Sequence, residues 1–275
     1  MSHILHIKDV CIAFHGKIVV DGICCSVPKG KTLAIVGESG SGKSVTALSI
    51  LGLLPNSSTV CGEIMFRGVQ LIGMSQKKLR SIRGSEIAMI FQEPMTSLNP
   101  VFTIKEQIEE VVRAHRSMSR KNVRNLTLAS MEEVGLHRDR IGSYPHEFSG
   151  GMRQRVMIAM ALAGEPSLLI ADEPTTALDA TTSKQIVELL MDIKNRRGMS
   201  MLFISHDLGL VSSIADEICV MRNGKNVETG DASQVLQNPK HAYTKALLAC
   251  RPSLEVKQER LITVQESMAL ASKLS

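Results

Sequence analysis

Short apolar runs alternate with longer segments of helical spacing over most of the 275-residue chain. Apolar runs of strand length, which predict buried strands, lie at residues 32–36, 86–91, 168–171, 201–205 and 217–221. Segments of helical spacing lie at residues 45–54 and 183–196. Strands that alternate with helices predict an α/β fold whose sheet is mainly parallel and covered on both faces.

Three regions depart from this alternation. Residues 1–35 predict short β segments broken at Gly16, Gly22, Pro28 and Gly30. From about residue 93 to 165 the pattern becomes helical and highly charged, which predicts a helical insertion. We therefore expect one domain over residues 1–250, a short helix near its end, and a polar tail or linker at 251–275.

The composition of the chain limits the classes of protein to which it can belong. Apolar residues make up 44% and aromatic residues 3%, with no Trp, so we expect an aliphatic core rich in Met. The net charge of +5 is mild, and the basic run at 77–83 is typical of a solvated helix face rather than a nucleic-acid patch. The six cysteines lack metal-ligand spacing and indicate reduced, mostly buried thiols.

The apolar runs are too short to cross a bilayer, and the N-terminus lacks the pattern of a signal peptide. We therefore expect a soluble protein whose role at a membrane, if it has one, comes through partners.

A glycine-rich loop between the first buried strand and its helix is the strongest chemical signal. Its glycines let backbone N–H groups curl around a phosphate chain, and the following helix points its positive end at the same anion. In a P-loop of this form Lys43 reaches the β- and γ-phosphates and the Ser44 hydroxyl takes one Mg²⁺ position. The loop consists of Gly37, Glu38, Ser39, Gly40, Ser41, Gly42, Lys43 and Ser44.

Two further segments complement this loop. The strand at 168–171 ends in Asp172 and Glu173, which we expect to hold Mg²⁺ and to orient the attacking water, respectively. Ser149, Gly150 and Gly151 form a second glycine turn that opens a helix and offers free backbone groups to an anion. One triphosphate does not need two such loops from one chain, so we expect each subunit to supply one loop to the other subunit's nucleotide.

These motifs resemble those of ATP-binding-cassette (ABC) ATPases over essentially the whole chain. The resemblance assigns Gln92 to the Q-loop, which senses Mg²⁺ and the attacking water, and His206 to the switch histidine that contacts the γ-phosphate. It assigns Asp179 to the D-loop at the dimer seam and Phe14 to an aromatic stack on adenine. The family's signature usually begins with Leu where this chain has Phe148, another apolar anchor.

The resemblance implies a P-loop NTPase (RecA-like) sheet with N-terminal antiparallel β segments and an inserted α-helical subdomain. It further implies an ATPase that needs ATP and Mg²⁺ and works as a head-to-tail homodimer or heterodimer. The expected partners are two membrane permeases and an extracytoplasmic solute-binding protein, with no nucleic acid. The expected location is peripheral, on the cytoplasmic face of the cell membrane.

Residues 91–100, 144–147 and 238–244 resemble ATPases of dipeptide, oligopeptide and nickel importers, and we favour peptides over nickel. One alternative is that the chain is the first half of a tandem ATPase. Another is an ABC ATPase of DNA repair or the ribosome, which is disfavoured because the chain lacks the insertions and linkers typical of those classes. A regulatory module without turnover is disfavoured because Glu173 and His206 are both present.

Overall fold

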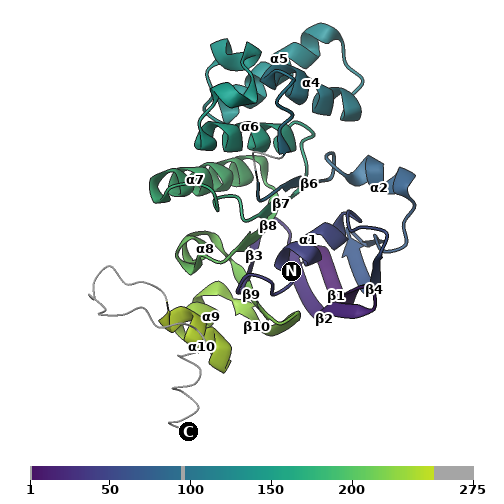
Figure 1. Cartoon of the computed structure of the whole chain (residues 1–275), viewed down its shortest axis with the longest axis vertical. Coiled ribbons are helices and arrows are strands. Elements are labelled where there is room, and N and C mark those ends of the chain that lie inside the picture. Colours follow the sequence, from purple (N-terminus) through teal and green to yellow (C-terminus); the bar gives the residue numbers. More distant parts are fainter. Residues whose placement is uncertain (1, 94–96, 251–275) are drawn as a thin grey trace.

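A computed structural model describes residues 2–93 and 97–250 of the chain (Figure 1). Its larger sheet has six strands in the order β10-β9-β3-β8-β7-β6. All neighbours in this sheet are parallel except the edge pair β9–β10. The strands are β3 (Thr32–Val36), β6 (Ile87–Ile90), β7 (Leu168–Asp172), β8 (Ser200–Ser205), β9 (Glu217–Arg222) and β10 (Lys225–Asp231). The predicted mainly parallel sheet is confirmed.

Alternate residues of the central strands enter two different cores. Met201 and Phe203 of β8 belong to one hydrophobic cluster, whereas Leu202 and Ile204 belong to the other. The same alternation holds in β3 and β7, and every residue of these three strands is buried. A strand covered on both faces has no solvated side, which explains why the sequence shows continuous apolar runs there.

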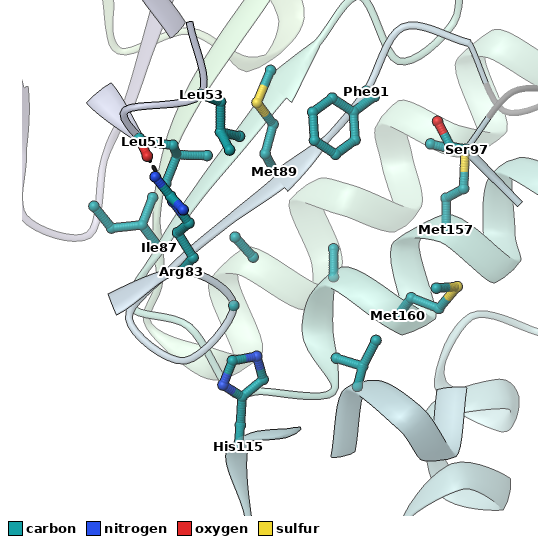
Figure 2. A pocket seen from close by; sticks show the side chains of 14 residues that line it. Leu51, Leu53, Arg83, Ile87, Met89, Phe91, Ser97, His115, Met157 and Met160 are labelled. Carbon is teal, nitrogen blue, oxygen red and sulfur yellow. Dashed lines mark hydrogen bonds between the residues drawn. The ribbon is translucent and has the colours of Figure 1, made fainter. Parts of the chain in front are cut away.

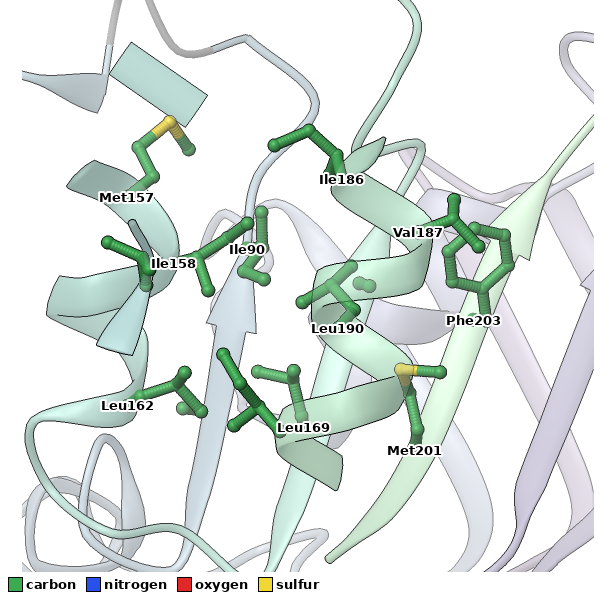
Figure 3. Packing of buried hydrophobic residues seen from close by; sticks show 14 of the residues in the cluster. Ile90, Met157, Ile158, Leu162, Leu169, Ile186, Val187, Leu190, Met201 and Phe203 are labelled. Carbon is green, nitrogen blue, oxygen red and sulfur yellow. The ribbon is translucent and has the colours of Figure 1, made fainter. Parts of the chain in front are cut away.

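Helices α6 (Gly150–Leu162) and α7 (Ala180–Arg197) contribute to the first cluster on one face of this sheet. Figure 3 shows Ile158 and Leu162 of α6 on one side of Leu190 of α7, and Phe203 of β8 beside Val187 on the other. The buried positions of α7 recur at helical spacing, and Asp179 caps its N-terminus by accepting a hydrogen bond from the backbone of Thr182.

The second cluster lies between the large sheet, helix α1 (Lys43–Ile50) and a four-stranded antiparallel sheet of order β2-β1-β4-β5. These strands are β1 (His3–Phe14), β2 (Lys17–Pro28), β4 (Ser58–Phe66) and β5 (Val69–Gln70). The expectation of short segments broken at Gly22 was wrong, because β1 and β2 are continuous strands of 12 residues. Gly22 instead sits with a left-handed φ of 64° where β2 carries one extra residue opposite β1.

The cysteines are less buried than their sequence context suggested. Of those in the described residues, Cys25 and Cys219 are buried, whereas Cys61 is exposed on β4. Cys61 faces solvent because this part of β4 alternates away from the core, as its burial pattern shows.

Charged helices lie between β6 and β7, as the sequence predicts, and Figure 1 places α4 and α5 at the far end of the molecule from β1 and β2. A capping box formed by Thr103 and Glu106 starts α4. The elements of this region are α4 (Ile104–His115), α5 (Arg120–Glu133), the 3₁₀ turns η1 (Arg138–Gly142) and η2 (Pro145–Glu147), and α6.

The remaining helices are short. They are α2 (Gln76–Ile82), α8 (Leu208–Ile214), α9 (Ala232–Gln237) and α10 (Ala242–Ala249). Within residues 2–93 and 97–250, no helix combines the length and apolar content that a membrane span needs. The expected tail at 251–275 lies outside the described residues.

Candidate functional site

The glycine-rich loop joins the end of β3 to the start of α1, as predicted. A side chain at Gly37 would overlap the backbone carbonyl of Met221 in the neighbouring strand β9. Gly42 is the N-cap of α1 and has a left-handed φ of 99°. Glycine is therefore required at both positions, once for close approach of two backbones and once for conformation.

Lys43 points back into the loop that precedes it. Its Nζ donates hydrogen bonds to the carbonyl oxygens of Gly37 (2.9 Å) and Glu38 (3.0 Å) and lies 3.7 Å from Oε1 of Glu173. The side chain is 4% exposed, and its burial lowers the pKa of the ammonium group from its ordinary value. The carbonyls and the carboxylate compensate this buried charge and fix its position.

The carboxyl end of β7 brings Asp172 to the start of α1. The Ser44 hydroxyl donates a hydrogen bond of 2.9 Å to Oδ1 of Asp172. Burial raises the pKa of the Asp172 carboxyl, against the opposing effect of the Ser44 hydrogen bond. A hydroxyl and a carboxylate at this distance are the hard oxygen donors that suit Mg²⁺, so the residues present fit the expected ion.

Glu173 is the centre of the polar contacts. Its backbone has a left-handed φ of 45°, rare for a residue with a side chain, and its N–H donates to the carbonyl of Ile204 on β8 at 3.0 Å. Its Oε2 accepts hydrogen bonds from Thr176 Oγ1 (2.8 Å) and Gln92 Nε2 (3.3 Å) and lies 3.2 Å from Nδ1 of His206. The structure thus brings together three residues that the sequence assigned to different motifs.

These groups surround a cleft of about 530 Å³. Three of its lining residues, Val19, Val45 and Thr176, lie outside the residues that the sequence predicted. Thr176 could have been found from its position three residues after Glu173 in a tight turn, whereas nothing in the local sequence marks Val19. The described lining consists of Val19, Glu38, Ser39, Gly40, Gly42, Lys43, Ser44, Val45, Gln92, Glu173, Thr176 and His206.

Phe14 lies at the end of β1, where it is partly buried against the second hydrophobic cluster. Among the described residues it is not part of the cleft lining. Its stacking on adenine stays a prediction.

The second glycine turn forms a separate pocket of about 350 Å³. Ser149 caps α6 by accepting a hydrogen bond from the backbone of Met152, and Gly151 is so close to α7 that a Cβ there would lie 2.6 Å from Thr182 Cγ2. Asp179 lines the same pocket, and hydrogen bonds from the backbone and hydroxyl of Thr182 lower the pKa of its carboxyl. Within the described residues the two pockets share no lining residue.

Comparison with known protein families shows the family to which the chain belongs. The family profile described as "ABC transporter" matches residues 20–176, which is more than half of the chain. The chain belongs to the ABC transporter family. A second profile, "Oligopeptide/dipeptide transporter, C-terminal region", matches residues 227–275 of this cassette. The predicted resemblance to ABC ATPases of the dipeptide and oligopeptide class, and the ATPase class of the chain, are therefore confirmed.

Curated relatives of the cassette are similar over nearly its whole length. The peptidoglycan transport ATP-binding protein YejF of Agrobacterium fabrum is 52% identical over 92% of this chain, which spans only 48% of that relative. The oligopeptide transport ATP-binding protein OppD of Bacillus subtilis is 46% identical, over 96% of this chain and 76% of the relative. The dipeptide transport ATP-binding protein DppD of the same organism is 44% identical, over 96% and 81%.

Solved structures agree with the fold of the cassette. The dimeric, post-hydrolysis structure of the ATP-binding cassette MJ0796, bound to ADP and Pi, has a TM-score of 0.74 and 27% identity, covering 83% of this chain and 98% of that one. The structure of cbiO1 from Clostridium perfringens, part of the transporter complex cbiONQ, has a TM-score of 0.75 and 26% identity, covering 86% and 92%. The predicted P-loop NTPase fold is confirmed.

Proposed function

We propose that this cassette hydrolyses ATP to energise a membrane importer of dipeptides or oligopeptides. The observation that carries the proposal is the match of residues 227–275 to the C-terminal region of oligopeptide and dipeptide transporters. This region is attached to a cassette whose cleft is lined by Lys43, Gln92 and Glu173. The names of the oligopeptide and dipeptide relatives support the same solute class.

In the proposed reaction the loop from Gly37 to Ser44 binds the phosphate chain, with the Lys43 ammonium on the β- and γ-phosphates. Ser44, Asp172 and the Gln92 side chain would hold Mg²⁺, which when bound neutralises charge on the phosphate oxygens. Glu173 orients the attacking water and accepts its proton. Its three polar contacts fix the carboxylate for this task.

His206 is the contact that we assign to the γ-phosphate. Its side chain is 58% exposed at the mouth of the cleft, so it is accessible to a phosphate group. Its Nδ1 is already directed at Glu173, which leaves the other ring nitrogen for the nucleotide.

We further propose a head-to-tail dimer of cassettes. Two separate pockets, one with the P-loop and one with Ser149, Gly151 and Asp179, suit a dimer in which each chain completes the other's nucleotide site. The dimeric state of the structurally similar cassette MJ0796 supports this arrangement. ATP would then close the dimer because it bridges the two chains, and hydrolysis would remove that bridge.

The permeases are proposed to dock in an apolar groove of about 550 Å³ beside the nucleotide cleft (Figure 2). The groove lies where β6 and the end of α1 meet the inserted helices, and Figure 2 shows Leu53, Met89 and Phe91 on one side and Met157 and Met160 of α6 on the other. Leu53 and Phe91 are each 40% exposed. An exposed apolar groove of this kind fits a short amphipathic helix.

Two consecutive residues connect this groove to the nucleotide cleft. Phe91 lines the groove, and the next residue, Gln92, lines the nucleotide cleft and contacts Glu173. A permease segment seated against Phe91 would therefore move with Gln92. The inserted helices of residues 93–165 are proposed as the unit that carries this coupling, and the cassette as a peripheral protein on the cytoplasmic face of the membrane. The solute would be delivered by an extracytoplasmic binding protein.

Uptake by whole cells tests the solute class. Cells that carry Glu173→Gln in place of the natural chain should lose uptake of a labelled oligopeptide while they keep uptake of labelled nickel. The matched control Glu188→Gln changes an exposed residue of α7 that pairs with Lys184 on the same helix, and it should leave peptide uptake intact. Loss of nickel uptake with retained peptide uptake would instead assign the cassette to a nickel importer.

A further inference from the structure

A tyrosine outside all the sequence motifs of the nucleotide cleft contacts the P-loop. Tyr243 lies on α10, and its hydroxyl accepts a hydrogen bond of 3.2 Å from the backbone N–H of Glu38. The side chain is fully buried, and burial raises the pKa of its hydroxyl. The tyrosine therefore stays neutral at physiological pH and can act as a steady hydrogen-bond acceptor.

The N–H of Glu38 and the carbonyl of Gly37 belong to the same peptide group. The carbonyl side of that group accepts the 2.9 Å hydrogen bond from Lys43 Nζ, while the N–H side donates to Tyr243. A planar peptide cannot rotate one end without the other, and hydrogen bonds at its two ends polarise each other. We propose that Tyr243 is a positioning residue that fixes the Lys43 ammonium through the Gly37–Glu38 peptide.

Contacts with β9 and β10 restrict the position of Tyr243. The guanidinium of Arg222, at the end of β9, lies 4.8 Å from the centre of the tyrosine ring. Glu228 of β10 anchors the start of α10 by accepting hydrogen bonds from the backbone N–H groups of Lys240 (2.8 Å) and His241 (3.0 Å). The His241 ring in turn accepts from the N–H of Tyr243 at 3.1 Å.

The hairpin between β9 and β10 contacts the same loop at a second point. The N–H of Gly224, in the turn of this hairpin, donates a hydrogen bond of 3.1 Å to the carbonyl of Ser41. The P-loop thus contacts both the turn between β9 and β10 and helix α10. Glu228, His241 and Tyr243 lie in the region that matches the transporter C-terminal profile, so this region contributes to the geometry of the phosphate site.

Removal of the hydroxyl alone tests the proposal. Tyr243→Phe keeps the ring against Arg222 and should weaken ATP binding about three- to tenfold, the range of one ordinary hydrogen bond. In a Lys43→Ala background the same change should have no further effect, because the group that Tyr243 positions is gone. The ATP-dependent rise in thermal midpoint at several ATP concentrations measures weak binding in all four proteins.

Tyr144→Phe is the matched control. The chain has two tyrosines, and Tyr144 is 41% exposed. This variant should bind ATP as the natural chain does. An equal loss from Tyr243→Phe in both Lys43 backgrounds, or no loss in either, would overturn the proposal and leave Tyr243 a packing residue.

A second measurement does not depend on the folding of Tyr243→Phe. In Tyr144→Phe protein grown with fluorotyrosine, Tyr243 is the single fluorinated residue. ATP should shift its ¹⁹F resonance, and the shift should vanish with Lys43→Ala; an equal shift in both proteins contradicts the coupling. The inference rests on the proposed contact of Lys43 with phosphate. The same experiments test that contact separately: if Lys43→Ala alone leaves ATP affinity unchanged, the proposed phosphate contact is wrong.

Discussion

Replacement of Glu173 by Gln should separate ATP binding from ATP hydrolysis. The change keeps the size of a side chain whose carboxylate contacts Thr176, His206 and Gln92 through one oxygen. An amide in the same place still offers an oxygen to Thr176. It cannot accept a proton from water at neutral pH, so the proposed catalytic role is lost while the packing remains.

The size of the effect follows from these roles. A positioned general base contributes about 10²- to 10⁴-fold to a rate, which corresponds to about 2.7–5.5 kcal/mol of activation free energy. Binding should change in the opposite direction. The carboxylate lies 3.7 Å from Lys43, at the position where the triphosphate is proposed to bind, so its neutralisation removes a repulsion of the γ-phosphate. We therefore expect ATP affinity to be kept or raised.

Two assays on the purified variant check this expectation. Phosphate release should fall at least 100-fold, and size-exclusion chromatography with ATP should show a stable dimer that the natural chain does not accumulate. Glu188→Gln, which neutralises an exposed carboxylate on α7, is the control and should keep the natural rate. A natural hydrolysis rate in Glu173→Gln would refute the assignment of Glu173.

Three further outcomes follow from the structure. Leu53→Glu places a charge in the proposed docking groove and should abolish recovery of permeases with the cassette. The control Val69→Glu, at an exposed apolar residue outside the groove, should leave that recovery unchanged. Equal recovery with both variants would show that the groove is not part of the interface. Gly164→Ala should lower the urea midpoint of unfolding because the new methyl group overlaps the Gly84 carbonyl. We expect a loss of about 1–3 kcal/mol or more in the free energy of unfolding. Gly142→Ala, with open space around the new methyl group, should keep the natural midpoint. Burial pushes the pKa of Glu228 upward, but hydrogen bonds from the backbone N–H groups of Lys240 and His241 oppose it, and the pKa lies below its ordinary value of 4.5. Its contribution to stability is therefore present above pH 4.5 and lost as pH falls through the native pKa, and Glu228→Gln should flatten that part of a stability–pH curve.

Much of the fold could be predicted because the central strands are buried on both faces. That burial produces the continuous apolar runs at β3, β7 and β8, and the order of strands and helices then determines the fold class. The sequence predicts β9 but not its hairpin partner β10. β10 is a partly exposed edge strand with the sequence KNVETGD, which carries almost no apolar signal, so it was missed together with the short helices α8 and α9.

Site residues could be predicted where a sequence motif determines the local backbone geometry. The P-loop glycines, Lys43 and Ser44 lie where a strand–loop–helix unit must place them, and Asp172 and Glu173 follow from the end of a parallel strand. Tyr243 could not be predicted in the same way. Its contact with Glu38 depends on how α10 packs against the rest of the fold across 205 residues of sequence, and no local pattern encodes that distance.

The proposed role of the cassette in an importer is tested most directly by isolating it from its native membranes in mild detergent and identifying the proteins that accompany it. We expect two different permease subunits together with a second cassette or a solute-binding protein. Recovery with ribosomes or DNA, or without any membrane protein, would contradict the transport function and leave only the ATPase.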